Sequence, residues 1–113
     1  MIKIKRIYED FSKTDGYRIL VDRLWPRGIS KGRAQIDLWA KDIAPSNDLR
    51  KWYSHDSTKR QEFQKRYLVE LKKSDSIKEI KRIVKEQKTI TLLSASKEDQ
   101  PIHAVVLQKI FEE

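Results

Sequence analysis

The fold class follows from one stretch of the sequence, Tyr17-Arg18-Ile19-Leu20-Val21-Asp22-Arg23-Leu24. Its middle is apolar at consecutive positions, so both faces of an extended chain would carry apolar side chains. That pattern is typical of a strand that is buried on both faces at the centre of a sheet. The turn signal Thr14-Asp15-Gly16 comes directly before it and marks the start of the strand.

Two further strands are predicted near the two ends of the chain. Residues Ile2–Tyr8 begin with alternating lysine and isoleucine, which is the pattern of a half-exposed strand. Residues Thr89–Ser94 are β-branched at the start and bounded by polar loops, and they predict another buried strand.

Helices are predicted between and after these strands. The loop Trp25–Gly32 contains proline and glycine and interrupts the regular pattern. Helical spacing of apolar residues then predicts a helix over Arg33–Ile43 and another after Pro45-Ser46, with Leu49, Trp52 and Tyr53 on its apolar side. Two capping boxes predict the starts of the next two helices: Thr58–Gln61 precedes Phe63, Tyr67 and Leu71, and Ser76–Glu79 opens a helix with Ile77, Ile80 and Val84. A last helix is predicted with Pro101 in its first turn and Ala104, Leu107 and Phe111 on its apolar side.

This order of elements predicts an α/β fold, in which a single small domain over residues 1–113 has a short mixed or parallel sheet flanked by helices. A length of 113 residues suits one domain that buries enough surface for a core. The absence of cysteine excludes disulfides, a thiol nucleophile and a cysteine metal site.

The charge balance favours anionic partners. The chain has 25 lysines and arginines against 17 aspartates and glutamates, for a formal net charge of +8. Such an excess attracts polyanions and anionic small molecules without specifying a fold. No apolar run is long enough to span a membrane, and the N-terminus lacks the apolar core of a signal peptide. We therefore expect a cytoplasmic protein without a membrane partner.

Polar residues gather directly after the central strand, and the first candidate cluster comprises Asp22, Arg23, Arg27, Ser30, Lys31 and Arg33. Ligands of open α/β sheets bind beyond the carboxyl ends of the strands, and guanidinium groups hold carboxylate or phosphate well. These basic residues therefore predict a site for a small anionic ligand, with Asp22 orienting the arginines. The alternative is structural: Asp22 pairs with Arg23 or Arg27 and pins the loop onto Trp25.

A second cluster follows the strand Thr89–Ser94, where Ser94 and Ser96 precede a helix that begins near His103. If the two strands are parallel neighbours, both clusters converge on one edge of the sheet. An imidazole in the first turn of that helix could act as a general acid or base, so His103 and Asp22 are the candidate catalytic residues. The alternative is that His103 bonds to a nearby backbone group.

No metal or cofactor is predicted. His55 and His103 are the only histidines, they are far apart in the sequence, and no ligand spacing of a metal site surrounds them. The simpler interpretation of His55-Asp56 is that Asp56 caps the start of a helix. No glycine-rich phosphate loop is present either.

Three functions are therefore compatible with the sequence. The first is binding or turnover of a small anionic ligand at the strand ends. The second is a nucleic-acid-binding module. The basic helices favour this function, although no recognition motif is present. The third is a protein-interaction domain without chemistry, which would use Trp52 and Tyr53 as exposed anchors. The sequence does not indicate an oligomeric state.

The run Gly16–Lys31, which contains Asp22-Arg23-Leu24-Trp25-Pro26-Arg27-Gly28, resembles the signature of the YeaO-like family, domain of unknown function 488. The similarity continues through Asp37-Leu38-Trp39, Leu49-Arg50-Lys51-Trp52 and His103–Leu107 and covers nearly the whole chain. This resemblance implies a small bacterial cytoplasmic protein with an α/β fold, and it implies no particular reaction.

Overall fold

The sheet is parallel throughout. The structure is a computed structural model that describes residues 1–54 and 56–113, and in these ranges four strands form one sheet in the order β1-β4-β2-β3. The strands are β1 (Ile2–Arg6), β2 (Tyr17–Leu20), β3 (Leu38–Trp39) and β4 (Ile90–Ser94). All three strand pairings are parallel, with Tyr17 opposite Ile90 in the central pair. The predicted α/β class is confirmed.

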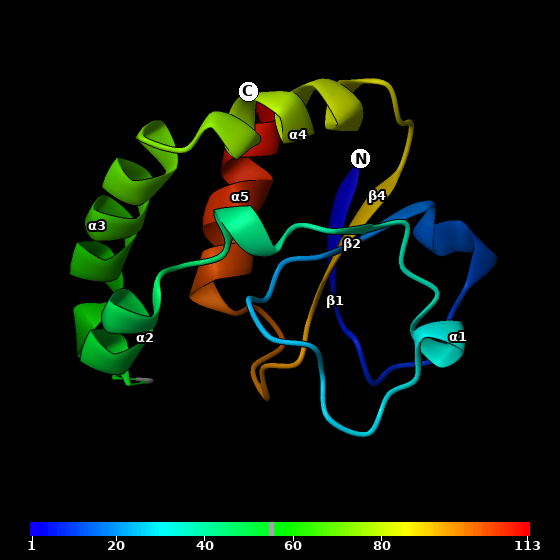
Figure 1. Cartoon of the computed structure of the whole chain (residues 1–113), viewed down its shortest axis with the longest axis horizontal. Helices are drawn as coiled ribbons and strands as arrows, with labels where there is room; N and C mark the ends of the chain where they lie inside the picture. The colour runs from blue at the N-terminus through cyan, green and yellow to red at the C-terminus, as the bar shows by residue number, and fades with distance from the viewer. Residues whose placement is uncertain (55) are drawn as a thin grey trace.

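The longer helices lie together on one side of the sheet, and α1 lies on the other side (Figure 1). The α-helices are α1 (Lys31–Ala34), α2 (Asn47–Tyr53), α3 (Arg60–Lys72), α4 (Asp75–Lys85) and α5 (Ile102–Glu112). Within the described residues, three short 3-10 helices lie in the connections: η1 (Lys13–Asp15) before β2, η2 (Lys41–Ile43) before α2 and η3 (Ser57–Lys59) before α3.

The central strand is buried on both faces, as predicted. Ile19 belongs to the cluster that the helices cover, whereas Leu20 belongs to a second cluster that α1 and the loops cover, and both are 0% exposed. Since successive side chains of a strand point to opposite faces, two neighbouring buried residues require cover on both sides. The strand is shorter than predicted: β2 ends at Leu20, and the chain bends at Arg23 and Leu24.

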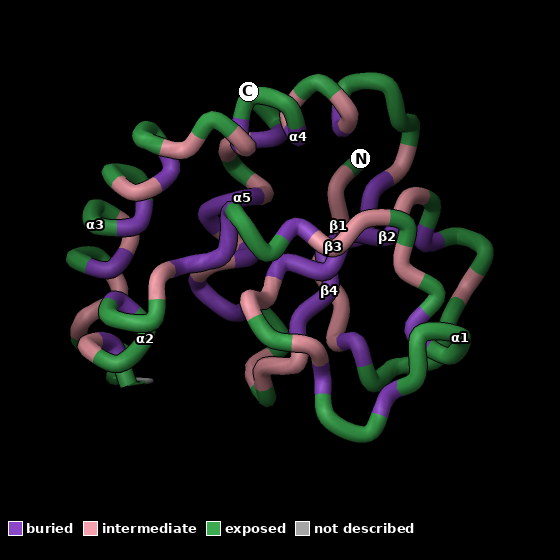
Figure 2. The backbone as a smooth tube through the Cα atoms, viewed as in Figure 1, coloured by how far each residue is buried: buried purple, intermediate pink, exposed green. Residues whose placement is uncertain are grey.

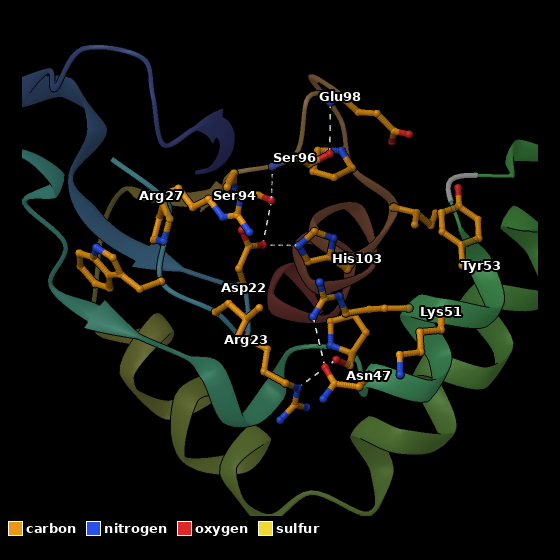
Figure 3. Close-up of a pocket in the computed structure, with 18 of the residues that line it drawn as sticks. Asp22, Arg23, Arg27, Asn47, Lys51, Tyr53, Ser94, Ser96, Glu98 and His103 are labelled. Carbon is orange, nitrogen blue, oxygen red and sulfur yellow. Dashed lines mark hydrogen bonds and ion pairs between the residues drawn. The ribbon is translucent and has the colours of Figure 1, made fainter. Parts of the chain in front are cut away.

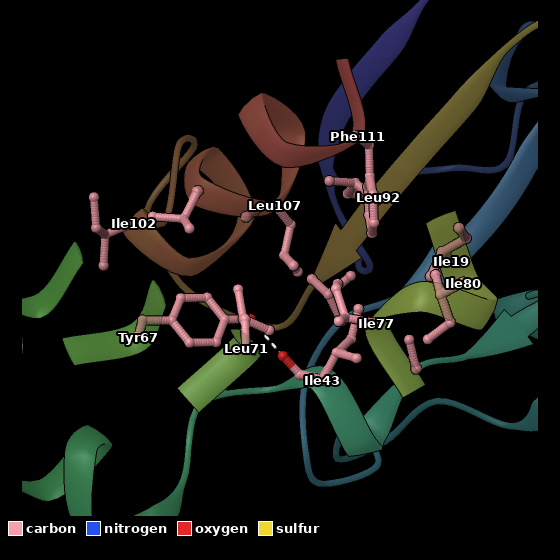
Figure 4. Packing of buried hydrophobic residues seen from close by; sticks show 14 of the residues in the cluster. Ile19, Ile43, Tyr67, Leu71, Ile77, Ile80, Leu92, Ile102, Leu107 and Phe111 are labelled. Atoms are coloured by element: carbon pink, nitrogen blue, oxygen red, sulfur yellow. Dashed lines mark hydrogen bonds between the residues drawn. The ribbon is translucent and has the colours of Figure 1, made fainter. Parts of the chain in front are cut away.

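The helix stripes also form as predicted. Phe63, Tyr67 and Leu71 are buried on one side of α3, and Figure 4 shows Tyr67 and Leu71 packed near residues of α4 and α5. The Tyr67 hydroxyl donates to the carbonyl of Ile43 and so connects α3 to η2. Figure 2 shows the same division along α3, where buried and exposed positions alternate at helical spacing.

The predicted helix over Arg33–Ile43 is wrong. The Ser30 hydroxyl caps α1 early, and the helix stops at Gln35, which is left-handed with φ of 45°. The chain then extends into β3, where Trp39 packs edge-on against Trp25 at 5.4 Å between ring centroids. Ile36 and Trp39 pack against the cluster around Leu20, whereas Ile43 belongs to the cluster that the helices cover, so the spacing of these three residues does not come from one helical face.

Neither predicted capping box forms. Asp56 caps η3, the 3-10 turn directly before α3, because its side chain accepts a hydrogen bond from the Thr58 amide. The capping role expected of Asp56 is confirmed. Helix α4 begins at Asp75, so Ser76 lies inside it and cannot cap it. Pro101 stands immediately before α5 rather than in its first turn. His55 lies outside the described residues.

None of the helices in residues 1–54 and 56–113 is both long enough and apolar enough to cross a membrane.

Gly16 provides a test of the turn before β2. Its φ of 68° disfavours any L side chain, and a Cβ there would lie 2.3 Å from the Thr89 carbonyl oxygen. Gly16→Ala is expected to lower the free energy of unfolding by roughly 2–3 kcal/mol. Gly28→Ala is the matched control, because Gly28 has φ of 77° but open space around a Cβ. It should cost only about 1 kcal/mol, and equal losses in urea unfolding would contradict the assigned close approach.

Candidate functional site

The carboxylate of Asp22 connects three segments at the carboxyl edge of the sheet. It accepts hydrogen bonds from the Ser94 hydroxyl at 2.8 Å, the Ala95 amide at 2.7 Å and His103 Nε2 at 2.9 Å. Because β2 and β4 are parallel neighbours, the polar residues that follow them lie side by side. The predicted convergence of the two clusters is confirmed for Asp22, Ser94 and His103.

These donors keep Asp22 ionised. Burial raises the pKa of its carboxyl group, but the hydrogen bonds from His103, Ala95 and Ser94 and the charge interaction with His103 outweigh burial and hold the pKa below its ordinary value of 3.8. An ionised carboxylate only accepts hydrogen bonds, so Nε2 of His103 carries the hydrogen of this contact. Asp22 therefore fixes the orientation of the ring of His103.

The prediction that Asp22 orients or pairs with the arginines is wrong. Its hydrogen bonds within the described chain come from Ser94, Ala95 and His103. Arg23 instead donates from Nη2 to the Ala44 carbonyl at 2.9 Å and from Nε to the Pro45 carbonyl at 3.2 Å. These bonds hold the loop after β2 against the start of α2.

A pocket of about 650 Å³ opens beside Asp22 and His103. This volume lies inside the range of about 300–1,000 Å³ typical of small-molecule sites. Figure 3 shows Asp22, Ser94 and His103 grouped together, with Arg27 and Lys51 on opposite sides of His103. The loop after β2, the start of α5 and helix α2 all contribute to the lining.

The charge of the pocket lining is predominantly positive. Its basic and acidic members are Arg23, Arg27, Arg50 and Lys51 against Asp22 and Glu98. Since three donors surround the carboxylate of Asp22, the basic side chains dominate the charge that the pocket presents to solvent. Arg27 is exposed, and the Tyr8 hydroxyl fixes its backbone by donating to its carbonyl at 3.1 Å.

Two residues of the predicted ligand-binding set lie outside the pocket lining. The hydroxyl of Ser30 accepts from the Arg33 amide at 3.1 Å, so Ser30 serves as the cap of α1. Lys31 is exposed on the first turn of that helix. Arg23, Arg27, Asp22 and His103 do line one pocket.

Helices α2 and α3 also contribute to the pocket, which the sequence did not predict. Asn47, Arg50, Lys51 and Tyr53 of α2 and Phe63 of α3 all line the pocket. The pair Arg50-Lys51 carries charge, but only the packing of α2 beside the loop after β2 brings it to the strand ends. No local signal in the sequence indicates that packing.

The exposed aromatic patch that a protein-interaction domain would need does not form. Tyr53 is only 7% exposed and packs against Phe63 at 4.7 Å between ring centroids. Trp52 is half-buried, with the guanidinium of Arg66 4.0 Å and the ammonium of Lys59 5.1 Å from its ring centroid.

Within the described residues, no three histidine, cysteine or carboxylate side chains gather as a metal site would require.

The fold and the pocket define a small parallel α/β domain with a basic site at its strand ends. A family model described as "Inactive DUF488-N3 subclade" matches residues 1–113. The chain therefore belongs to the DUF488 family, which confirms the YeaO-like resemblance.

Relatives in two bacterial species support this assignment. The chain is 43% identical over 107 residues to the uncharacterised protein YeaO of Escherichia coli, covering 94% of this chain and 92% of the relative. It is 38% identical over 109 residues to an uncharacterised protein of Mycobacterium tuberculosis, covering 96% and 92%. No solved structure matches the chain significantly.

Proposed function

We propose that this protein binds a small anionic ligand, bearing phosphate or carboxylate, in the pocket at the carboxyl edge of the sheet. One observation carries the proposal: four basic side chains line the pocket, whereas the hydrogen bonds to Asp22 surround its central carboxylate with donors. Arg27 and Lys51, which are exposed, would contact the ligand, and Arg23 would hold the loop in place.

Binding is favoured over turnover. The matched subclade is described as inactive, and Asp22 already uses its oxygens on Ser94, Ala95 and His103. A carboxylate in this position supports the imidazole rather than reacting itself. The ring of His103 lines the pocket and is half-buried, so a ligand could reach it. Its role as general acid or base stays a prediction.

Arg27→Ala tests the proposal directly. Without a ligand, the basic residues of the pocket repel one another, so the variant should be as stable as wild type or up to about 0.5 kcal/mol more stable. Phosphate, nucleotides or small carboxylates should raise the melting temperature of wild type, since a ligand of the folded state stabilises it by mass action. The same compounds should have much less effect on the variant.

The matched control is Arg33→Ala, which removes an exposed arginine of α1 that does not line the pocket. It should keep the full response to the anions. A clearly destabilised Arg27→Ala protein with an unchanged response would instead assign Arg27 a structural role and refute the proposal.

Nucleic-acid binding is the second candidate, because most of the charge excess lies away from the pocket. Residues 59–88 contain eleven basic and five acidic side chains and include α3 and α4. Part of this charge is already engaged, as in the pair of Arg66 and Glu62 at 3.1 Å. Retention on heparin across a salt series, compared between wild type and Arg27→Ala, separates this surface from the pocket.

A further inference from the structure

The exposed basic side chains of the pocket lining come from two separate segments. Arg27 lies in the loop after β2, whereas Arg50 and Lys51 lie on α2, and all three residues are exposed. Figure 3 shows Arg27 and Lys51 on opposite sides of His103. The pocket therefore presents positive charge from two directions rather than from one cluster.

The side chains of Arg27 and Lys51 are available to a ligand. Within residues 1–54 and 56–113, neither of these side chains takes part in a hydrogen bond or an ion pair. The guanidinium of Arg23, by contrast, already donates to the carbonyls of Ala44 and Pro45. Hydrogen bonds between a cationic side chain and an anion are among the strongest that proteins form, so Arg27 and Lys51 are the groups that would hold an anion in this pocket.

The space between the two basic positions disfavours an anion. The ionised carboxylate of Asp22 contacts His103 there, and its side chain keeps 19% of its surface exposed. Like charges repel at short range, so an anion midway between Arg27 and Lys51 would be destabilised by this carboxylate. Each basic position is instead suited to an anionic group of its own.

The fold also fixes how far apart the two positions lie. The bonds from Arg23 to the Ala44 and Pro45 carbonyls hold the loop after β2 against the residues that precede α2. The Tyr8 hydroxyl donates to the carbonyl of Arg27 at 3.1 Å and holds the backbone of that position. The pocket volume of about 650 Å³ leaves room for a molecule that spans both positions. A ligand that bridges them must therefore have a particular length.

From this arrangement we infer that the ligand carries two anionic groups, phosphate or carboxylate, at the ends of a short uncharged spacer. One group binds at Arg27, and the other binds at Lys51 with Arg50 beside it. Because the spacer makes the second contact intramolecular, such a ligand binds more tightly than either group alone. This inference rests on the proposed function, since it assumes that the pocket receives an anion, and it adds the number and the spacing of the charges.

A series of bisphosphates tests this inference by titration calorimetry on the full chain. The series contains the bisphosphates of linear alkanediols from propanediol to octanediol. Pyrophosphate is the control for total charge, because its two groups are adjacent, and hexyl phosphate is the control for the apolar spacer. We expect the affinity to pass through an optimum as the spacer lengthens. The best bisphosphate should bind at least about ten-fold more tightly than either control, a difference of about 1.4 kcal/mol.

Two exposed positions provide variants that should fold. Arg27→Gln and Lys51→Gln each remove one basic position, so either variant should bind the best bisphosphate only about as tightly as hexyl phosphate. Arg33→Gln on α1 and Lys72→Gln on α3 are the matched controls, because both residues are exposed and lie outside the pocket lining. Both control variants should keep the optimum in spacer length.

The outcomes separate this inference from the proposed function. An optimum in spacer length that Arg27→Gln and Lys51→Gln both abolish supports the inference. If pyrophosphate or hexyl phosphate binds as tightly as the best bisphosphate, the inference is overturned and anion binding is left intact. An optimum that survives in either variant also overturns it, because the ligand then does not bridge the two positions. Failure of every anion to bind overturns both proposals.

Discussion

Replacing Asp15 with alanine is expected to lower the free energy of unfolding by about 3–5 kcal/mol, because it leaves a buried arginine without its counter-charge. Arg18 points into the face of the sheet opposite the long helices and is only 1% exposed. Its guanidinium donates to the Asp15 carboxylate, to the Ala34 carbonyl at 2.8 Å and to the Gln35 carbonyl at 3.0 Å. The carbonyls would remain in the variant, but the negative charge would be gone.

Asp15 also gathers other donors. Lys5 contacts both of its carboxylate oxygens at 3.1 Å, and the Ser12 amide donates to it at 3.0 Å. Burial raises the pKa of Asp15, but the Ser12 amide, Lys5 and Arg18 outweigh burial and hold the pKa below its ordinary value. The stabilisation is therefore fully present above about pH 4 and is lost as the pH falls through the lowered pKa.

The measurement is urea unfolding of wild type, Asp15→Ala, Arg18→Met and the double variant at neutral pH. Removing both charges should cost less than the sum of the single losses, since the double variant leaves no unpaired charge in the interior. Glu62→Ala is the control, because the exposed pair of Glu62 and Arg66 should contribute about 0.5 kcal/mol or less. Losses that simply add would contradict a coupled buried pair.

The sequence predicted correctly the elements whose buried apolar residues recur at the regular spacing of a strand or a helix. Ile19 and Leu20 predicted a strand that is covered on both faces, and Phe63, Tyr67 and Leu71 predicted a helix with one buried side. In both cases the period of the apolar residues follows from backbone geometry alone. Arg18 is the exception in the central strand, because its burial depends on Asp15 and on carbonyls that come from α1.

The segment between Arg33 and Ile43 shows where periodicity is ambiguous. Its apolar residues recur every three or four positions, which a helix explains, but a short strand followed by a 3-10 turn gives the same spacing. The decisive contacts are tertiary. The Asp37 carboxylate accepts a hydrogen bond from the Arg18 amide at 2.8 Å, and Nε1 of Trp39 donates to the Asp22 carbonyl at 2.8 Å. These bonds hold the segment at the edge of the sheet.

The sequence predicted the place of the candidate site but not all of its contacts. Strand order alone brings Asp22, Ser94 and His103 to one edge, because ligands and polar side chains gather at the carboxyl ends of parallel strands. The partner of Asp22 could not be predicted, since nearby arginines compete in sequence with a histidine that is 81 positions away. The contribution of Arg50 and Lys51 depends on how α2 packs, which the sequence does not encode locally.

The Asp22 carboxylate accepts hydrogen bonds from the end of β4 and from α5, so Asp22→Ala is expected to lower the free energy of unfolding by about 3–5 kcal/mol at pH 7. The variant leaves the Ser94 hydroxyl, the Ala95 amide and His103 Nε2 without their shared acceptor. His103→Ala removes only one of the three donors and should cost less, about 1–2 kcal/mol. This order of effects distinguishes an acceptor shared by three donors from an isolated Asp–His pair.

The pH dependence carries the stronger test, because the folded pKa of Asp22 is lowered. Its stabilising contribution is complete above the ordinary pKa of 3.8 and declines as the pH falls through the lower folded value, where the carboxyl group is protonated in both states. Urea unfolding of wild type and Asp22→Ala should therefore give stabilities that approach one another as the pH falls below about 4, while Asp15 contributes equally to both proteins and cancels. A stability difference that stays constant over this range would show that Asp22 acts through packing rather than through its charge, and the ionised acceptor assigned to the centre of the pocket would have to be abandoned.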